Sequence, residues 1–166
     1  MWILEKYFEA RTGNVPYYAR YSLAKIMWIP LRKVMNVVII PNIPFSSWRI
    51  GLYRMLGYKI GKNVFIGMKC YLDDTEPSSF TVGDNSIISY GCYFALHGKG
   101  QNRSTITLED GVYIGTRSTI IAGEAGLTIG SGATVGAGSL VNKPVEPGSI
   151  VGGNPARLLR SEKSSG

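Results

Sequence analysis

Histidine and cysteine are scarce in this chain, which limits the metal and thiol chemistry available to it. The 166 residues include one histidine, His97, and two cysteines, Cys70 and Cys92. One histidine does not supply the three imidazole ligands of a common type of zinc site, so no metal is expected. Both cysteines fall at small inward positions of the repeat described below, and we interpret them as buried free thiols rather than as a disulfide.

Long uninterrupted apolar runs are also missing. The most apolar stretch, residues 27–45, contains Arg32, Lys33 and three prolines, whereas a transmembrane helix needs about 20 mostly apolar residues. Residues 1–10 hold two glutamates and lack a basic start before an apolar stretch, so they do not resemble a secretory signal. We therefore expect a cytoplasmic location, with peripheral contact at the inner face of the membrane left open.

What the chain has in abundance is a six-residue repeat. Its starts are Ile60, Ile66, Leu72, Val82, Ile88, Phe94, Leu108, Ile114, Ile120, Ile129, Val135 and Val141. Every third spacing is longer than six, which places insertions of 4, 8 and 3 residues at the same point of an 18-residue cycle. If each cycle is one coil of a solenoid, the insertions lie on one edge, and we predict the active site there.

The residue types at fixed positions of the repeat support a solenoid. Four residues after each regular start the side chain is small or β-branched, as at Cys70 and Ser86, and most starts are followed by glycine, as at Gly67. We expect these glycines to supply corner backbone angles that other residues resist. One such segment cannot bury its own apolar face, so the coils must stack. Hairpin dipeptides such as Asn-Gly are missing from the corners, which disfavours a sandwich of hairpins.

Residues 60–160 resemble the hexapeptide-repeat acyltransferases. The most specific segments are 129–141, with the sequence IGSGATVGAGSLV, then Lys143, and then 153–157, with the sequence GNPAR. The resemblance implies an all-β solenoid, a left-handed parallel β-helix of about four coils, whose handedness comes from the family alone. It also implies an acyl donor, acetyl-CoA, and a homotrimer with sites between neighbouring subunits.

The chain divides into an N-terminal extension (1–59), the β-helix with its C-terminal cofactor-binding segment (60–160) and a polar tail (161–166). The extension holds nine basic and two acidic residues, which is the whole formal net charge of +7, and all three tryptophans. Basic and aromatic residues in helix-length segments are typical of a surface that lies on an anionic membrane. The first coil of a solenoid also needs a cap, and both interpretations stay open. Nucleic acid is not an expected partner, because no binding module is recognisable.

Three segments of the extension have a helical pattern: residues 2–10, 18–28 and 47–56. The last has Ser46 or Ser47 available as an N-cap and Gly57 as a stop. Its basic residues, Arg49 and Arg54, are expected to face either lipid headgroups or solvent.

His97 stands in the longest insertion, beside glycines. In the family that the chain resembles, a histidine in this loop is the general base that takes the proton of an acceptor hydroxyl as its oxygen attacks the acetyl-CoA thioester. An ordinary imidazole pKa of about 6.5 suits this task near neutral pH. Since no second histidine and no cysteine outside the repeat positions are present, direct transfer is favoured over a covalent acyl-enzyme.

The first insertion begins with two aspartates, Asp73 and Asp74, directly after Leu72. In sugar-acetylating relatives an aspartate of this loop binds the acceptor, and either residue matches that position. Carboxylates accept hydrogen bonds from sugar hydroxyls, and they can also orient an imidazole.

The resemblance also carries over contacts with the pantetheine arm of the cofactor. Thr116 and Ala137 match pantetheine-binding positions. Tyr113 stands where relatives often have tryptophan, which leaves the packing around the cofactor in doubt.

The phosphates of the cofactor need cations. Asn142 and Lys143 match positions near the diphosphate, although threonine is common where Asn142 stands. Arg157 and Arg160 fall where the tail of the family meets the nucleotide phosphate.

The leading hypothesis is an O-acetyltransferase that modifies a glycan, either a surface polysaccharide or its lipid-linked precursor. The run 56–64 looks most like enzymes of polysaccharide and O-antigen decoration, and no βαβ nucleotide-binding pattern precedes residue 60. A non-catalytic scaffold or binding module and an acetyltransferase of small molecules remain as alternatives. Coenzyme A binding separates the scaffold from the enzymes.

Overall fold

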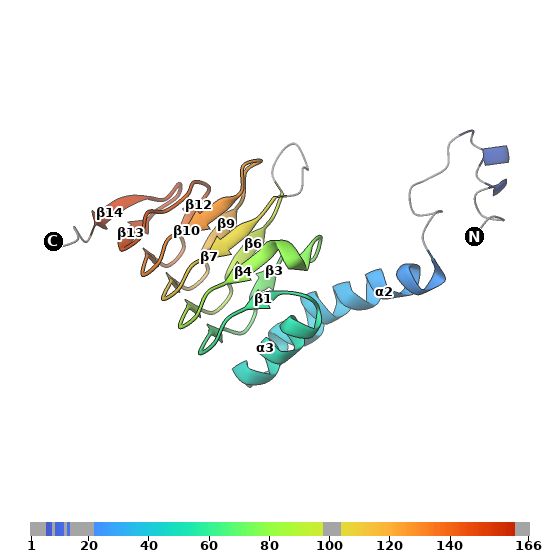
Figure 1. Cartoon of the computed structure of the whole chain (residues 1–166), viewed down its shortest axis with the longest axis horizontal. Coiled ribbons are helices and arrows are strands. Elements are labelled where there is room, and N and C mark those ends of the chain that lie inside the picture. Colours follow the sequence, from blue (N-terminus) through green and yellow to red (C-terminus); the bar gives the residue numbers. More distant parts are fainter. Residues whose placement is uncertain (1–5, 8, 12, 14–21, 98–103, 162–166) are drawn as a thin grey trace.

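The computed structural model in Figure 1 shows a prism of stacked strands with a helical segment at its N-terminal end. It describes residues 6–7, 9–11, 13, 22–97 and 104–161. Of the helix predicted over residues 2–10, residues 6–7 and 9–10 are described, and all of them are helical. The loop after His97 and almost all of the tail lie outside the described residues. Among the described helices, none combines the length and the apolar character needed to span a membrane.

Three parallel sheets form the sides of the prism. Sheet A contains β1 (Lys59–Ile60), β4 (Phe80–Val82), β7 (Ile106–Leu108) and β10 (Leu127–Ile129). Sheet B contains β2 (Phe65–Ile66), β5 (Ile87–Ile88), β8 (Tyr113–Ile114), β11 (Thr134–Val135), β13 (Ser149–Gly152) and β14 (Arg157–Ser161). Sheet C contains β3 (Tyr71–Leu72), β6 (Tyr93–Ala95), β9 (Thr119–Ile121) and β12 (Leu140–Val141). Among these described strands, β14 alone runs antiparallel to its neighbour, β13.

The predicted repeat sets the register of all three sheets. Each start pairs with the start one coil further on, as Leu72 does with Phe94 and Phe94 with Ile120. The starts are buried, except Ile60, which is partly buried in the first coil. The small positions are buried as well, and Cys70 and Cys92 are free thiols. The predicted solenoid of four coils is therefore confirmed.

The glycines that follow the starts have another cause than the one predicted. A Cβ at Gly67 would lie 2.6 Å from the backbone nitrogen of Tyr90 in the next coil. These glycines therefore allow close stacking of the coils, and the corner angles arise three residues after the starts. The residues there with positive φ are Asn63, Lys69, Asn85, Gly91, Gly111, Arg117, Gly132 and Gly138.

The N-terminal helix differs in position from the prediction. The helix α2 (Leu23–Val34) continues into a π-helical turn, η2 (Met35–Ile39), and a 3-10 turn, η3 (Ile40–Asn42). The prediction of a helix over 18–28 was thus wrong at its end, because α2 runs through Pro30. An interior proline removes a backbone donor and clashes with the preceding turn, yet α2 continues past Pro30 to Val34.

The next helix, α3 (Ser46–Met55), lies within one residue of the predicted range. Gly57, with φ of 103°, ends it as expected. The predicted serine N-cap is wrong, because α3 has no side-chain cap and the Ser46 hydroxyl lies within hydrogen-bond distance of the Ile66 backbone in β2 instead.

The first coil has no coil beneath it, and side chains of the extension bind its open carbonyls on all three sides. Arg54 donates to the end of β1 on sheet A. Arg49 donates from Nε to the Ile66 carbonyl of sheet B at 3.1 Å. Asn36 donates to the Leu72 carbonyl of sheet C at 2.6 Å. The expected cap is present, and the prediction that Arg49 faces lipid or solvent was wrong, because its side chain is buried in this cap.

We expect Arg49→Met to lower the free energy of unfolding by about 2–4 kcal/mol, because charge-assisted hydrogen bonds are lost and buried carbonyls are left unpaired. Arg54→Met is the matched control, since Arg54 is exposed and water can replace it. Its expected cost is below about 1 kcal/mol. Thermal unfolding at one fixed protein concentration measures both. Equal losses in the two variants would show that burial of Arg49 adds nothing to the cap.

Candidate active site

The strands of sheet C deliver the predicted site residues to one edge of the prism, called here the sheet C edge. Asp73 and Asp74 follow β3, His97 follows β6, and Lys143 stands two residues after the end of β12. Neighbouring strands lie about 4.8 Å apart, so β6 and β12, with β9 between them, are ~10 Å apart. The first insertion contains the 3-10 turn η4 (Pro77–Ser79), and the third follows β9. All three insertions begin after neighbouring strands of sheet C, so the prediction that they leave the prism at one edge is confirmed (Figure 1).

A histidine–carboxylate pair joins the first two excursions. The His97 Nδ1 atom lies 2.9 Å from Asp73 Oδ2. The same Asp73 oxygen accepts a hydrogen bond from the Leu96 backbone N–H at 2.8 Å, and Oδ1 accepts one from the Thr75 N–H at 2.9 Å. The Asp73 side chain is fully buried, whereas 49% of the His97 side chain is exposed. The pair therefore has a fixed inner partner and an accessible outer one.

The Asp73 carboxyl is held in its ionised form. Burial raises its pKa, but hydrogen bonds from Thr75 and Leu96 and the nearby His97 outweigh that effect and hold the pKa below its ordinary value. An ionised carboxylate only accepts hydrogen bonds, so His97 Nδ1 must carry the proton in this contact. The lone pair of the neutral ring is then on Nε2, the nitrogen that Asp73 does not bind.

The two aspartates differ in what they can reach. Asp73 has no exposed surface and both of its oxygens accept internal hydrogen bonds, which favours the orienting role over direct contact with an acceptor. Asp74 is only partly buried and accepts a hydrogen bond from the Tyr71 hydroxyl at 3.1 Å. The Tyr71 ring stacks on that of Tyr93 with centroids 4.7 Å apart. Asp74 thus remains the aspartate that is open to an acceptor.

Two buried residues of the extension hold the backbone beside Asp73, and the sequence analysis missed both. The Tyr58 hydroxyl lies 3.0 Å from the Leu72 carbonyl and 3.1 Å from the Asp73 carbonyl. It also lies 3.1 Å from Oδ1 of Asn36, whose amide binds Leu72. The available signal was weak: Asn36 is the only polar residue in the apolar run 34–40.

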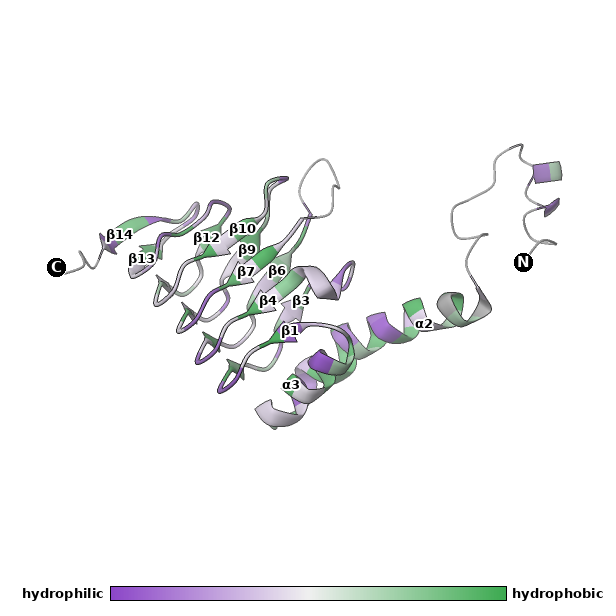
Figure 2. Cartoon of the chain, in the orientation of Figure 1, coloured by the Kyte–Doolittle hydropathy of each residue, from purple (hydrophilic) through white to green (hydrophobic). Residues whose placement is uncertain are grey.

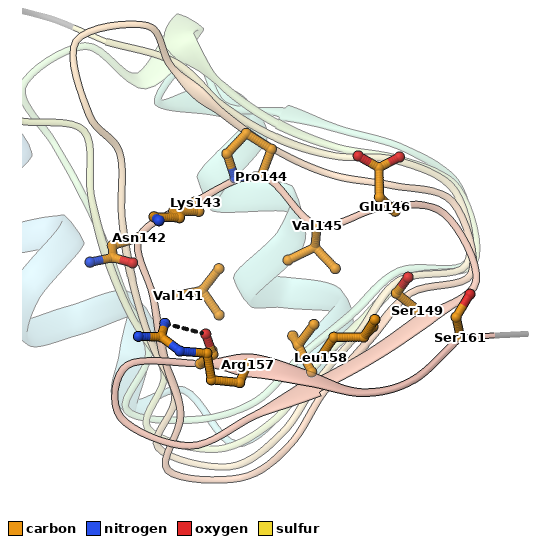
Figure 3. Close-up of a pocket in the computed structure, with 12 residues that line it drawn as sticks. Val141, Asn142, Lys143, Pro144, Val145, Glu146, Ser149, Arg157, Leu158 and Ser161 are labelled. Carbon is orange, nitrogen blue, oxygen red and sulfur yellow. Dashed lines mark hydrogen bonds between the residues drawn. The ribbon is translucent and has the colours of Figure 1, made fainter.

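Three of the predicted cofactor-binding residues line one cavity at the C-terminal end of the prism. Asn142, Lys143 and Arg157 border a volume of about 410 Å³. Figure 3 shows these three side chains together on one side of the cavity, with Glu146 on the opposite side. The Arg157 Nη1 donates to the Ala156 carbonyl at 3.2 Å. The two cationic side chains, Lys143 and Arg157, make this side of the cavity suitable for binding phosphate groups.

The other predicted cofactor contacts do not lie at this cavity. Thr116 and Ala137 are exposed at the corner between sheets B and C, where the Gly138 N–H donates to the Thr116 carbonyl at 2.8 Å. Tyr113 is exposed on β8 in sheet B, and Arg160 is exposed on β14 outside the cavity lining. A single chain therefore does not gather all the predicted contacts.

The described part of the chain also contains histidine, cysteine, aspartate and glutamate side chains, the common metal ligands. Within it, no three His, Cys, Asp or Glu side chains come together in a group that could hold a metal ion.

Known proteins resemble this chain over most of its length. A family model described as the hexapeptide repeat of succinyl-transferase matches residues 58–94 and 105–143. YvoF of Bacillus subtilis, which is classed with the acetyltransferases, is 34% identical over 143 residues that cover 81% of each chain. The chain belongs to the hexapeptide-repeat acetyltransferases. SACOL2570 of Staphylococcus aureus is 35% identical over 127 residues, and the chain spans 60% of its length.

Solved structures of hexapeptide-repeat acetyltransferases share the fold. VCA0836 from Vibrio cholerae has a TM-score of 0.68 at 27% identity, over 86% of this chain and 95% of that one. A second structure of VCA0836 contains acetyl-CoA. A maltose O-acetyltransferase from Clostridium difficile has a TM-score of 0.65 at 20% identity, over 86% and 90% of the two chains, which is a likeness of fold alone. The predicted left-handed parallel β-helix is confirmed by this agreement.

The single histidine makes its tautomer directly measurable. We expect ¹⁵N NMR of the imidazole, at a pH where the ring is neutral, to show the proton on Nδ1, because the Asp73 carboxylate accepts it. Asp73→Ala should move population to the Nε2–H tautomer, while the neighbouring change Asp74→Ala should leave the spectrum unchanged. If Asp73→Ala has no effect, the carboxylate does not set the tautomer.

Proposed function

We propose that this hexapeptide-repeat acetyltransferase transfers the acetyl group of acetyl-CoA to a hydroxyl of a glycan. The observation that carries the proposal is the pair formed by the exposed His97 ring and the buried Asp73 carboxylate. The pair leaves Nε2 as a base at an accessible position. The acetyl-CoA complex of VCA0836 supports the same donor in this chain.

The proposed chemistry is one direct transfer. His97 Nε2 takes the proton of the acceptor hydroxyl while that oxygen attacks the thioester carbonyl carbon of acetyl-CoA. The carbon–sulfur bond then breaks, and the imidazolium returns the proton to the thiolate of coenzyme A. The buried Asp73 carboxylate stabilises the imidazolium between these steps, as a charge-assisted hydrogen bond does. No covalent enzyme intermediate is needed.

The phosphates of the donor are assigned to the cationic side of the C-terminal cavity. Lys143 and Arg157 supply the positive charge there, and Asn142 supplies an amide. The cavity continues the same sheet C edge, on β12, that holds His97 on β6.

A homotrimer is part of the proposal because one chain separates the predicted contacts. Thr116 and Ala137 stand at the corner between sheets B and C, while His97 stands at the sheet C edge. A neighbouring prism that presents its own corner to this edge would complete the pantetheine site. Tyr113, on the outer face of sheet B, would then lie toward a subunit contact.

The glycan acceptor is supported by the groups that follow from Asp73, the partner of His97, to its neighbour Asp74. Asp74 offers a carboxylate to sugar hydroxyls, and the stacked rings of Tyr71 and Tyr93 stand beside it. Carboxylates and aromatic surfaces are partners that suit the polar and apolar sides of a sugar ring. The same positions fit the resemblance of residues 56–64 to enzymes that decorate polysaccharides.

Removal of the base should abolish most of the transfer. His97→Ala should lower kcat by ~10²–10⁴-fold, which is the usual contribution of a positioned acid–base group. Asp73→Ala should lower kcat by at least ~10-fold in the wild-type background, and much less when His97 is already replaced, because the two residues act as a unit. Release of coenzyme A in the presence of a panel of sugars measures the rates. A His97→Ala variant with near-normal turnover would exclude the proposed base.

Binding of the donor tests the cavity separately from the chemistry. Lys143→Gln and Arg157→Gln should each weaken coenzyme A binding by roughly 10–100-fold, because each removes a charge-assisted hydrogen bond to phosphate. Lys59→Gln, an exposed change on the first coil, should leave the affinity unchanged. Calorimetry gives the dissociation constants. If wild-type protein shows no binding, a non-catalytic scaffold is the better explanation.

A further inference from the structure

The N-terminal helix carries an apolar stripe that the described part of the protein leaves uncovered. Met27, Leu31, Val34 and Val38 follow one another at spacings of four, three and four residues, so they share one helix face. Between 48% and 71% of each side chain is exposed. Figure 2 shows hydrophobic and hydrophilic colours along α2, which runs outward from the prism. The buried Asn36, on the other side of the helix, attaches it to the first coil.

The same helix also carries basic residues. Arg32 and Lys33 lie in the last turn of α2, and Lys33 is exposed. In the sequence, Lys25 stands seven residues before Arg32, and the described helix contains no acidic residue. An amphipathic helix with basic residues opposite an apolar stripe is the form that binds the surface of anionic bilayers.

We propose that α2 and η2 lie on the surface of an anionic lipid bilayer. The apolar stripe enters the boundary between headgroups and acyl chains, and Arg32 and Lys33 bind headgroup phosphates. Two exposed rings near the start of α3, Phe45 and Trp48, lie with centroids 5.3 Å apart. Tryptophan, whose ring is apolar apart from one N–H donor, is enriched at this boundary.

Charge favours lipid over a second copy of the chain as the occupant of the stripe. Two copies that met along it would bring two extensions together, each with a net charge of +7, and like charges oppose association. An anionic surface is attracted by Arg32 and Lys33 and by the whole extension, which carries the net charge of +7.

Membrane contact would also bring the enzyme to a lipid-linked acceptor, a consequence that rests on the proposed function. The attachment itself does not rest on it, because the stripe and its charges are independent of His97. The two proposals therefore fail separately.

Vesicle flotation of the full chain tests the attachment. The wild type should bind vesicles of phosphatidylcholine with phosphatidylglycerol at low salt, more weakly at high salt, and little to phosphatidylcholine alone. The double variant Arg32→Gln with Lys33→Gln should weaken anionic-vesicle binding roughly 25-fold, since each basic residue near the surface contributes about fivefold. Lys62→Gln with Arg117→Gln changes the net charge equally at exposed positions of the prism, outside the extension, and should bind as the wild type does.

The apolar stripe has its own matched pair of variants. Leu31→Ser with Val34→Ser should weaken vesicle binding at least ~10-fold, because less apolar surface enters the bilayer. Phe65→Ser, at an exposed position on β2, should leave vesicle binding unchanged. Light scattering and coenzyme A affinity are recorded for every variant. Unchanged assembly and unchanged coenzyme A affinity, together with lost vesicle binding, are the expected result.

Three outcomes would overturn the proposal. The first is that the wild type does not bind anionic vesicles at low salt. The second is an equal loss of binding in the control variants on the prism. The third is a change of oligomeric state in the Leu31 and Val34 variant, which would assign the stripe to contacts between copies. If the wild type binds vesicles but not coenzyme A, the proposed function is wrong and the proposed membrane attachment is supported.

Discussion

Backbone pairing between successive coils is the constraint on which the rest of this molecule depends. Strands of two or three residues are too short to be stable alone, so each coil needs hydrogen bonds to the coil beside it. Glycines such as Gly67 let the coils approach closely enough for those bonds. The first coil is the exception, and Arg49 and Asn36 replace its missing neighbour with side-chain donors. The extension is therefore part of the same hydrogen-bonded structure as the prism.

The candidate site depends on the same pairing between coils. Stacking places the ends of β3 and β6 side by side, which brings Asp73 to His97 although 23 residues separate them along the chain. Asn36 and Tyr58 then fix the backbone at Leu72, one residue before the carboxylate. The geometry of the histidine thus depends on residues of the helical extension as well as on its own loop. Sheet C positions Asp73 and His97, and the hydrogen bonds of the cap hold the backbone beside Asp73.

Spacing alone was enough to predict the four coils, the buried thiols and the shared edge of the insertions, because core-facing residues recur at a fixed interval. It was not enough to predict the role of Arg49 or Asn36. Each acts on a carbonyl that is unpaired only because the stack ends there, and no local pattern marks such an end. The burial of Asp73 could not be predicted for a different reason: Asp73 and Asp74 are identical neighbours in the sequence, and only the fold decides which one faces inward.

The closed ends also limit how large the assembly can become. A solenoid made of parallel coils has exposed strand edges at both ends, and such edges can recruit further chains into fibres. Here Arg49 and the residues around it occupy one end, and β14 turns back antiparallel on β13 at the other. A second copy that approaches end to end therefore meets side-chain donors at one end and an antiparallel strand at the other. Both features disfavour growth of the solenoid beyond its own coils.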